Sequence, residues 1–396
     1  MRGDIVFVDL EVSSDPERRE ILDMGAIKEN EGEFHKVSLS ELGEYISDCR
    51  FIAGHNILNH DLVYLKDKVR EVLSFKPIDT LYWSPLLFPE KPYHHLVKND
   101  KIEVMNLNNP VNDCKTAAQL FDDEINAFES LPETMKEIFF GLLSEKVHFQ
   151  YFFEYLGYKT EVDNLQELIA QTFHGRICEN APLAEHIKRY PAELAFVLAL
   201  INTNSLESDT PAWVRKTFPQ VVRIFHELVN SPCDGCAYCE NTFNPVRGLK
   251  NFFGEDKEFR VFDEGFSQKD PVVSALHNES MLVVVPTGGG KSLIFQLPAL
   301  MASRTVRGLT VVISPLLSLM KDQIDNLKAK NIDNAVSINS LLSPLQRAEA
   351  IRRVEEGEAA LLYVSPEFLR SKTLERLLMR RQVVRFVIDE AHCFSA

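Results

Sequence analysis

The chain has 396 residues, of which 45% are hydrophobic and 26% are charged, as in globular proteins that bury sizeable cores. Its formal net charge of -15 argues against electrostatic binding of nucleic acid over a broad surface, because counterion release requires many Lys and Arg side chains against phosphates. We therefore expect two or three domains, with any nucleic-acid contact confined to a local surface.

Neither end of the chain nor its interior carries an obvious membrane signal. No apolar run has membrane-spanning length, and the opening MRGDIVFVDLEVSS lacks the charged start, long apolar core and cleavage site of a signal peptide. We expect a cytoplasmic protein with no membrane partner. In that reducing compartment, clustered cysteines indicate metal binding rather than disulfides.

Residues 1–121 alternate predicted strands and helices, beginning with DIVFVDLEV, ILDMGAIK and RFIAGHNI, which predicts an α/β domain. Asp9 and Glu11 lie two residues apart in the first strand and so share one face. Asp61 follows Asn56 and His60 in AGHNILNHD, and Asp113 begins a helix in VNDCKTAAQLF. Four carboxylates from three segments can hold two divalent ions, which activate water and stabilise the leaving oxygen of a phosphodiester.

The order D-x-E, N-x-x-x-H-D and then a helix-borne Asp resembles the DEDD 3′–5′ exonucleases of the RNase H-like fold, over about residues 1–121. The resemblance implies two Mg²⁺ or Mn²⁺ ions at the catalytic residues Asp9, Glu11, Asp61 and Asp113. The family positions the attacking water with a His five residues, or a Tyr four residues, before the last Asp; here these positions are Asn108 and Asn109. We therefore expect an intact metal site that degrades DNA slowly, and faster after Asn108→His.

From about residue 122 to 246, helical patterns such as LQELIAQTF and AELAFVLALI replace the strands, which predicts a helical middle region. It contains a metal-binding segment, CDGCAYC, with three cysteines, Cys233, Cys236 and Cys239. Cys178 is the best fourth ligand, because the other cysteines fall in the flanking domains, and His226 is the nearest substitute. The spacing resembles half of a ferredoxin-type run and the iron–sulfur segments of some DNA helicases and nucleases. A [4Fe–4S] cluster, Zn²⁺ and free thiols all remain open.

After about residue 247 come four short apolar runs, MLVVVP, LTVVISP, ALLYVSP and VVRFVIDEA, separated by helical segments. Such runs predict a parallel sheet covered on both faces. A glycine-rich loop joins the first run to a helix, where backbone N–H groups and the helix N-terminus can hold a phosphate. The predicted phosphate site comprises Thr287, Gly288, Gly289, Gly290, Lys291 and Ser292.

The chemistry of a nucleotide-hydrolysing site can be assigned to four of these C-terminal residues. Lys291 is expected to reach the terminal phosphates and Ser292 to ligate Mg²⁺. Asp389, at the end of the run VVRFVID, is expected to hold Mg²⁺, often through water, and Glu390 to polarise the attacking water. The sequence therefore predicts an ATP and Mg²⁺ site.

The segments PTGGGKSL, TVVISPLLSLMKDQ, LLYVSPEFL and DEAHCFS, in this order, resemble the first motor domain of RecQ-family DNA helicases of superfamily 2, over about residues 247–396. The resemblance implies an incomplete RecA-like P-loop domain with motifs Q, I, Ia, Ib and II, ATP-driven DNA unwinding, and work in DNA repair and recombination. It also implies that Gln268 contacts adenine and that SPLLSLMKDQ lies along the DNA backbone. In the family this Gln follows Phe-Arg within a few residues, whereas here it lies eight positions after Arg260.

We thus predict an α/β chain in three parts, residues 1–121, 122–246 and 247–396, whose motor is truncated just after the DEAH motif. Without the family's second domain, which supplies an arginine, such a motor is expected to bind nucleotide weakly and neither to hydrolyse it usefully nor to unwind DNA. The predicted function is a DNA-processing enzyme acting on single-stranded or 3′-ended DNA, with a helicase-type ATP hydrolase fused to an exonuclease-like domain. The rival interpretation is a non-catalytic DNA-binding remnant with both sites disabled.

Overall fold

The computed structural model describes residues 4–13, 20–29, 32–90, 109–203, 208, 210–262, 265–286 and 288–391. The chain divides into two compact units, Met1–Ile169 and Ala170–Ala396. The boundary predicted at residue 121 lies inside helix α4 (Pro110–Ser130). The division of the chain into three functional parts remains a prediction. Within the described ranges, none of the helices has the length and hydrophobicity that a membrane crossing requires.

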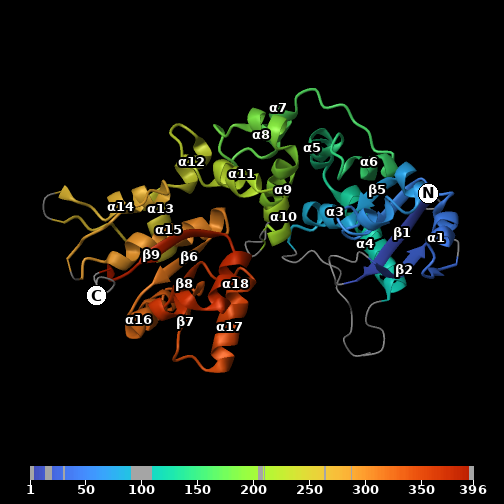
Figure 1. Ribbon diagram of the computed structural model, residues 1–396. Coiled ribbons are helices and arrows are strands. Elements are labelled where there is room, and N and C mark those ends of the chain that lie inside the picture. The colour runs from blue at the N-terminus through green and yellow to red at the C-terminus, as the bar shows by residue number, and fades with distance from the viewer. Residues whose placement is uncertain are drawn as a thin grey trace. The chain divides into compact units, whose positions relative to one another are not determined.

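The first unit is built on a five-stranded mixed sheet in the order β3-β2-β1-β4-β5 (Figure 1). β2 is antiparallel to both β1 and β3, whereas β4 and β5 run parallel to β1. The strands are β1 (Ile5–Val12), β2 (Ile21–Ile27), β3 (Phe34–His35), β4 (Phe51–Gly54) and β5 (Lys76–Asp79). The helices besides α4 are α1 (Leu39–Ile46), α2 (Asp61–Leu65), α3 (Thr80–Leu87), α5 (Glu133–Leu143), α6 (Gln150–Leu156) and α7 (Leu165–Thr172), which crosses the boundary to the second unit. The strands expected from DIVFVDLEV, ILDMGAIK and RFIAGHNI are confirmed as β1, β2 and β4.

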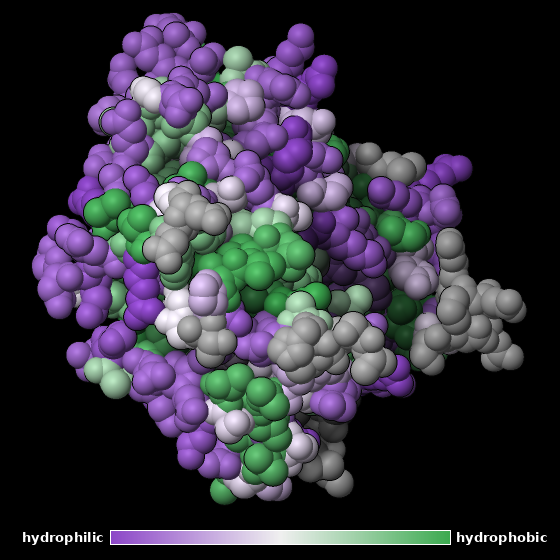
Figure 2. All heavy atoms as spheres, turned by 90° about the vertical axis from the view of Figure 1, so that its left-hand side faces the viewer, coloured by the Kyte–Doolittle hydropathy of each residue, from purple (hydrophilic) through white to green (hydrophobic). Residues whose placement is uncertain are grey.

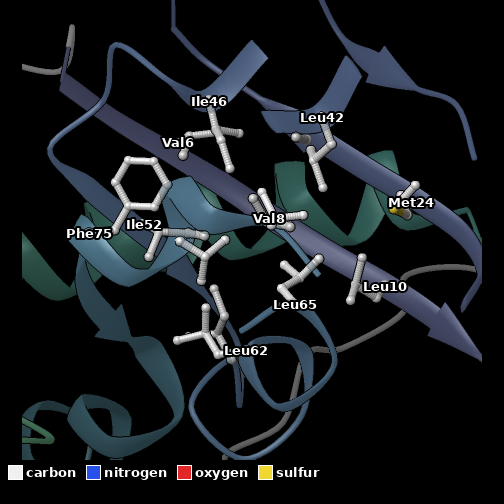
Figure 3. Packing of buried hydrophobic residues seen from close by; sticks show 14 of the residues in the cluster. Val6, Val8, Leu10, Met24, Leu42, Ile46, Ile52, Leu62, Leu65 and Phe75 are labelled. Carbon is white, nitrogen blue, oxygen red and sulfur yellow. The ribbon is translucent and has the colours of Figure 1, made fainter. Parts of the chain in front are cut away.

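The central strand β1 separates a hydrophobic core from an acidic face. Val6, Val8 and Leu10 lie in a buried cluster with side chains of α1 and α2 (Figure 3). On the opposite face, Phe7 packs edge-on against Phe121 of α4, with ring centroids 5.7 Å apart. Because side chains alternate along a strand, Asp9 and Glu11 follow Phe7 on the α4 side.

An aromatic core holds the helices α3, α4 and α6 together. Trp83 of α3 stacks on Phe152 of α6 with centroids 4.0 Å apart, and Phe128 of α4 meets both rings edge-on. Glu124 of α4 is fully buried here, and its Oε1 accepts a hydrogen bond of 2.9 Å from Ser84 Oγ. Burial raises the pKa of Glu124 well above its ordinary value, so a protonated carboxyl is favoured at this position.

The second unit contains a four-stranded parallel sheet in the order β7-β8-β6-β9. Its strands are β6 (Leu309–Ile313), β7 (Ala335–Ile338), β8 (Leu361–Val364) and β9 (Val383–Ile388). Its helices are α8 (Leu183–Arg189), α9 (Pro191–Asn202), α10 (Ala212–Thr217), α11 (Gln220–Val229), α12 (Ala237–Thr242), α13 (Pro245–Phe253), α14 (Lys269–Leu276), α15 (Lys291–Thr305), α16 (Leu317–Lys328), α17 (Pro344–Glu355) and α18 (Lys372–Arg380). Side chains of α15 and α16 pack on one face of the sheet and those of α17 and α18 on the other, as the continuous apolar runs predict.

One predicted strand is wrong. The run MLVVVP, residues 281–286, has no strand pairing, and its Leu282 and Val284 side chains are 82% and 83% exposed. A strand forms only where its backbone groups hydrogen-bond to a neighbouring strand, and in the described chain this run pairs with none, although one side of β9 is unpaired. β9 is an edge strand with Phe386 and Ile388 exposed, and Figure 2 shows apolar side chains gathered on the side of the molecule that carries it.

Candidate functional sites

Three of the four predicted carboxylates meet at the end of β1. Asp9, Glu11 and Asp113 each offer an oxygen within 4.8 Å of the others. Burial, followed by the charges of Asp61, Asp113 and Glu11, raises the pKa of Asp9 to about 7. A cluster of carboxylate oxygens in this spacing has the ligand chemistry that Mg²⁺ and Mn²⁺ prefer.

The fourth carboxylate, Asp61, lies beside β1 and outside that group of three. It is 1% exposed, and its Oδ1 accepts a hydrogen bond of 2.8 Å from the Leu10 N–H. The ladder between β1 and β4 ends at the pair Phe7 and Ala53, so this carboxylate serves a backbone donor that β4 no longer reaches. The imidazole ring of His60 lies next to this carboxylate, with Nδ1 3.3 Å from Asp61 Oδ1.

Asn109, one of the two residues at the water-positioning places, has a structural role. Its side chain caps α4 by accepting a hydrogen bond of 3.0 Å from the Val111 N–H. Asn108 lies outside the described residues. Asn109 therefore sets the start of the helix that carries Asp113, as Asn commonly does at this position.

Asp79 supports the acidic site and was missed by sequence reasoning. Its buried carboxylate accepts backbone hydrogen bonds from Asn56 at 2.7 Å, Leu58 at 3.0 Å and Leu81 at 3.0 Å. It thus both caps α3 and fixes the loop that leads into Asp61. The available signal was its place directly after the short strand KPID and before a helix, which is a typical N-cap position.

In the second unit, the glycine-rich loop meets the acidic pair that follows β9. Gly288 and Gly290 have φ values of 76°, a left-handed conformation that glycine adopts readily, and α15 begins at Lys291. Lys291 Nζ lies 3.6 Å from Glu390 Oε1, and Gln323 Nε2 donates to Asp389 Oδ2 at 3.1 Å. Ser292 is the second residue of α15, whereas Thr287 lies outside the described residues.

The long spacing between Arg260 and Gln268 is absorbed by a small hairpin. Val261 and Ser267 form an antiparallel bridge, and the Arg260 N–H donates to Gln268 Oε1 at 2.9 Å. The amide nitrogen of Gln268 donates to the carbonyl oxygens of Gly289 at 2.9 Å and Gly290 at 3.1 Å. The predicted nucleotide-contacting glutamine therefore lies against the phosphate loop despite the altered spacing.

The four predicted cysteines of the helical region come together. Their sulfur atoms lie within 4.8 Å of one another, with Cys178 Sγ 3.4 Å from Cys233 Sγ and Cys233 Sγ 3.7 Å from Cys239 Sγ. Cys236 Sγ accepts a hydrogen bond of 3.3 Å from the Glu179 N–H. His226, the predicted substitute ligand, does not join this group of sulfur atoms. Its ring nitrogens contact the side chains of Asn230 and Gln382.

Comparison with known proteins identifies the class of the C-terminal segment. Residues 267–396 match the family model of the DEAD/DEAH box helicases. This match agrees with the contact between the phosphate-loop lysine and the acidic residue after β9. The C-terminal part of the chain therefore has the features of a helicase-type ATPase domain.

The curated relatives narrow this class. The chain is 42% identical over 147 residues to the ATP-dependent DNA helicase RecQ of Haemophilus influenzae, covering 37% of this chain and 22% of the relative. It is 40% identical over 147 residues to the probable ATP-dependent DNA helicase RecS of Bacillus subtilis, covering 37% and 27%. It is 40% identical over 134 residues to the ATP-dependent helicase SGS1 of Saccharomyces cerevisiae, covering 33% and 9%. The matches support a RecQ-type helicase segment, and the chain spans about a quarter or less of the length of these relatives.

Proposed function

We propose that this chain belongs to a DNA-processing enzyme that couples a RecQ-type ATP-dependent motor to a metal-dependent 3′–5′ exonuclease-like domain. The observation that carries the motor assignment is the meeting of Lys291 with Glu390, next to Asp389, in a segment similar to DNA helicases. ATP with Mg²⁺ is the expected ligand, with Lys291 on its terminal phosphates and Ser292 and Asp389 holding the metal ion. Glu390 would then polarise the attacking water.

Nucleotide binding tests the motor assignment directly. Equilibrium binding of ATP with Mg²⁺ should weaken about tenfold or more in Lys291→Ala, because the lysine supplies a charge-assisted contact to the phosphates. Lys328→Ala, which removes a lysine at the far end of α16, is the matched control and should bind as the unmodified chain does. Equal ATP affinity in all three proteins would contradict the assignment.

The exonuclease assignment rests on Asp9, Glu11 and Asp113 meeting within 4.8 Å on a mixed sheet with helices on both faces. With Asp61 beside them, they supply carboxylates for two metal ions that would activate water and stabilise the leaving oxygen. DNA is the proposed substrate because the relatives of the motor segment are DNA helicases.

Release of nucleotides from 3′-labelled single-stranded DNA in the presence of Mn²⁺ tests this activity. We expect slow release that Asp9→Asn abolishes and that Asp123→Asn, an exposed acid on the same helix as Asp113, leaves unchanged. The absence of metal-dependent release from the unmodified chain, with DNA binding retained, would favour the rival interpretation of a DNA-binding remnant.

We also propose that Cys178, Cys233, Cys236 and Cys239 bind one Zn²⁺ ion. Four thiolates about 2.3 Å from a tetrahedral ion are separated from one another by about 3.8 Å. The two closest pairs, at 3.4 Å and 3.7 Å, and the overall limit of 4.8 Å fit this spacing. In a four-iron cluster each thiolate binds a different iron at an outer corner, which requires a wider set of sulfurs. The spacing therefore favours Zn²⁺ over [4Fe–4S].

Metal analysis after anaerobic purification separates these metals. We expect about one zinc ion per chain, no iron or sulfide, and loss of the zinc in Cys178→Ser. Cys49→Ser, which changes a buried cysteine outside the cluster, is the matched control and should keep its zinc. A brown protein with stoichiometric iron and sulfide would contradict the assignment.

A further inference from the structure

The second unit contains a cavity of about 540 Å³ that is lined by four arginines together with neutral polar and apolar residues. We call it the arginine pocket and define it by Arg176, Arg247, Arg304 and Arg307, together with the aromatic ring of Phe252. No Asp or Glu of the described chain lines it. In a chain with 58 acidic and 43 basic residues, this is a local concentration of positive charge.

Among the described residues, three arginines of the pocket, Arg176, Arg247 and Arg304, contact neutral partners. Arg176 donates to the Ile201 carbonyl and the Asn202 side chain, and Arg247 donates to Asn241 Oδ1 at 2.7 Å. The Arg304 guanidinium lies over the Phe252 ring, 4.1 Å from its centroid. Among the described residues, none of these three arginines forms an ion pair, whereas Arg189, Arg223, Arg352, Arg353 and Arg380 of the same unit pair with glutamates. The charges of Arg176, Arg247 and Arg304 are therefore available to an anion.

The pocket is built by close packing of two helices. A Cβ on Gly248 of α13 would lie 2.6 Å from Met301 Sδ of α15, so glycine permits these helices to approach. Arg247 is adjacent to Gly248, and Arg304 lies about one turn after Met301. Because the two helices pack closely here, both arginines line the same cavity. The cavity is thus a built feature of the fold.

The pocket is separate from the nucleotide site. Lys291 begins α15, whereas Arg304 lies in its last turn, and a helix of this length places them about 20 Å apart. An anion held by Arg304 is therefore a different group from the phosphates expected at Lys291.

We propose that the arginine pocket binds the phosphate groups of a nucleic-acid strand. Arg is the side chain best suited to two-point recognition of phosphate, and the half-buried Phe252 ring beside Arg304 adds an aromatic surface that can contact a base or sugar. The choice of nucleic acid as the source of phosphate rests on the proposed function, because the motor segment resembles DNA helicases. A local pocket of this kind also explains how a chain of net charge -15 can hold DNA.

Salt-dependent binding of a fluorescently labelled single-stranded DNA tests the proposal, measured with no divalent metal or ATP added. The double variant Arg247→Gln and Arg304→Gln changes two exposed side chains and should weaken binding about tenfold. It should also reduce the slope of log Kd against log salt by about 1.4, since each phosphate contact on a single strand contributes about 0.7. The charge-matched control, Arg189→Gln with Arg380→Gln, removes two arginines that pair with glutamates and should leave the slope nearly unchanged.

Two outcomes would overturn the proposal. An unchanged DNA slope with a lowered melting temperature would show that Arg304 only stabilises the C-terminal end of α15. Loss of inorganic phosphate binding in the double variant, with no change in its DNA affinity, would show a small-anion site instead. Neither readout involves ATP binding or DNA cleavage, so a failure of the proposed function is distinguishable from a failure of the pocket.

Discussion

Gly25 of β2 lies against Pro110, the first residue of α4: a Cβ on Gly25 would be 2.5 Å from the Pro110 carbonyl carbon. Gly25 is also the antiparallel partner of Asp9, and its carbonyl accepts a hydrogen bond of 3.4 Å from Cys114 Sγ. The absence of a side chain at residue 25 therefore sets how closely Asp113 approaches Asp9 and Glu11.

Gly25→Ala should loosen the acidic site. The added methyl group meets backbone rather than a flexible side chain, so α4 must move away and carry Asp113 with it. We expect weaker Mn²⁺ binding by calorimetry, by about tenfold, and a loss of stability of about 1 to 3 kcal/mol from overpacking. Gly32→Ala, where a Cβ meets nothing within 4 Å, is the control. Unchanged Mn²⁺ affinity in Gly25→Ala would show that Asp113 is not a ligand.

Asp79→Asn should destabilise the loop that leads to Asp61. The substitution replaces one of the two oxygens that accept the N–H groups of Asn56 and Leu58, and a buried donor left without its partner costs about 1 to 3 kcal/mol. Chemical denaturation followed by circular dichroism measures the loss. The control is Asp67→Asn, which changes an exposed residue in a turn of the same unit. It should change the free energy of unfolding by less than about 0.5 kcal/mol. Equal stability of the two variants would refute the role of Asp79.

The sequence predicted the candidate sites better than it predicted their supports. Asp9, Glu11 and Asp113 could be found because period-two alternation and a helix start place carboxylates on one side of a sheet. Gly25 could not, because its role depends on contact with Pro110, 85 positions later in the chain, and no local pattern reports such a contact.

The failed strand has a related cause. Residues 281–286 have strand composition, but pairing is a property of the neighbour as well as of the segment, and β9 forms the edge of the described sheet. By contrast, the cysteine spacing already indicated the main contacts, since Cys233 and Cys236 flank the turn at Gly235 and Cys239 lies in the first turn of α12. The sequence already indicated a metal, and the distances between the four sulfur atoms were needed only to propose Zn²⁺ over [4Fe–4S].

Glu124→Gln should make the stability of the chain less dependent on pH. Burial raises the pKa of Glu124 in the folded chain, so the folded state favours the protonated carboxyl while the unfolded chain ionises near 4.5. The stability from this group is fully present below pH 4.5 and is lost as pH rises toward the folded-state value, by at most about 1.4 kcal/mol per pH unit.

Thermal denaturation between pH 4.5 and 8 checks the sign of this linkage. The glutamine is neutral at every pH and keeps an acceptor for Ser84, so Glu124→Gln should gain stability relative to the unmodified chain as pH increases. Glu129→Gln, an exposed residue of the same helix, should show no such gain. A stability difference that stays constant over this range would rule out a raised pKa at Glu124.

Gln268→Ala should weaken the binding of ATP and GTP together. The Gln268 amide oxygen accepts a hydrogen bond from the Arg260 N–H, and the amide nitrogen donates to the carbonyls of Gly289 and Gly290. Loss of this side chain therefore removes the hydrogen bonds that hold the phosphate loop. The phosphates of ATP and GTP are the same, so both nucleotides should be affected equally. We expect both dissociation constants to rise by about tenfold, measured by competition with a fluorescent nucleotide. Gln346→Ala, which removes part of the helix cap of α17, controls for a general loss of stability. A loss confined to ATP would instead show that Gln268 exchanges these backbone bonds for adenine, as the resemblance to the helicase family implies.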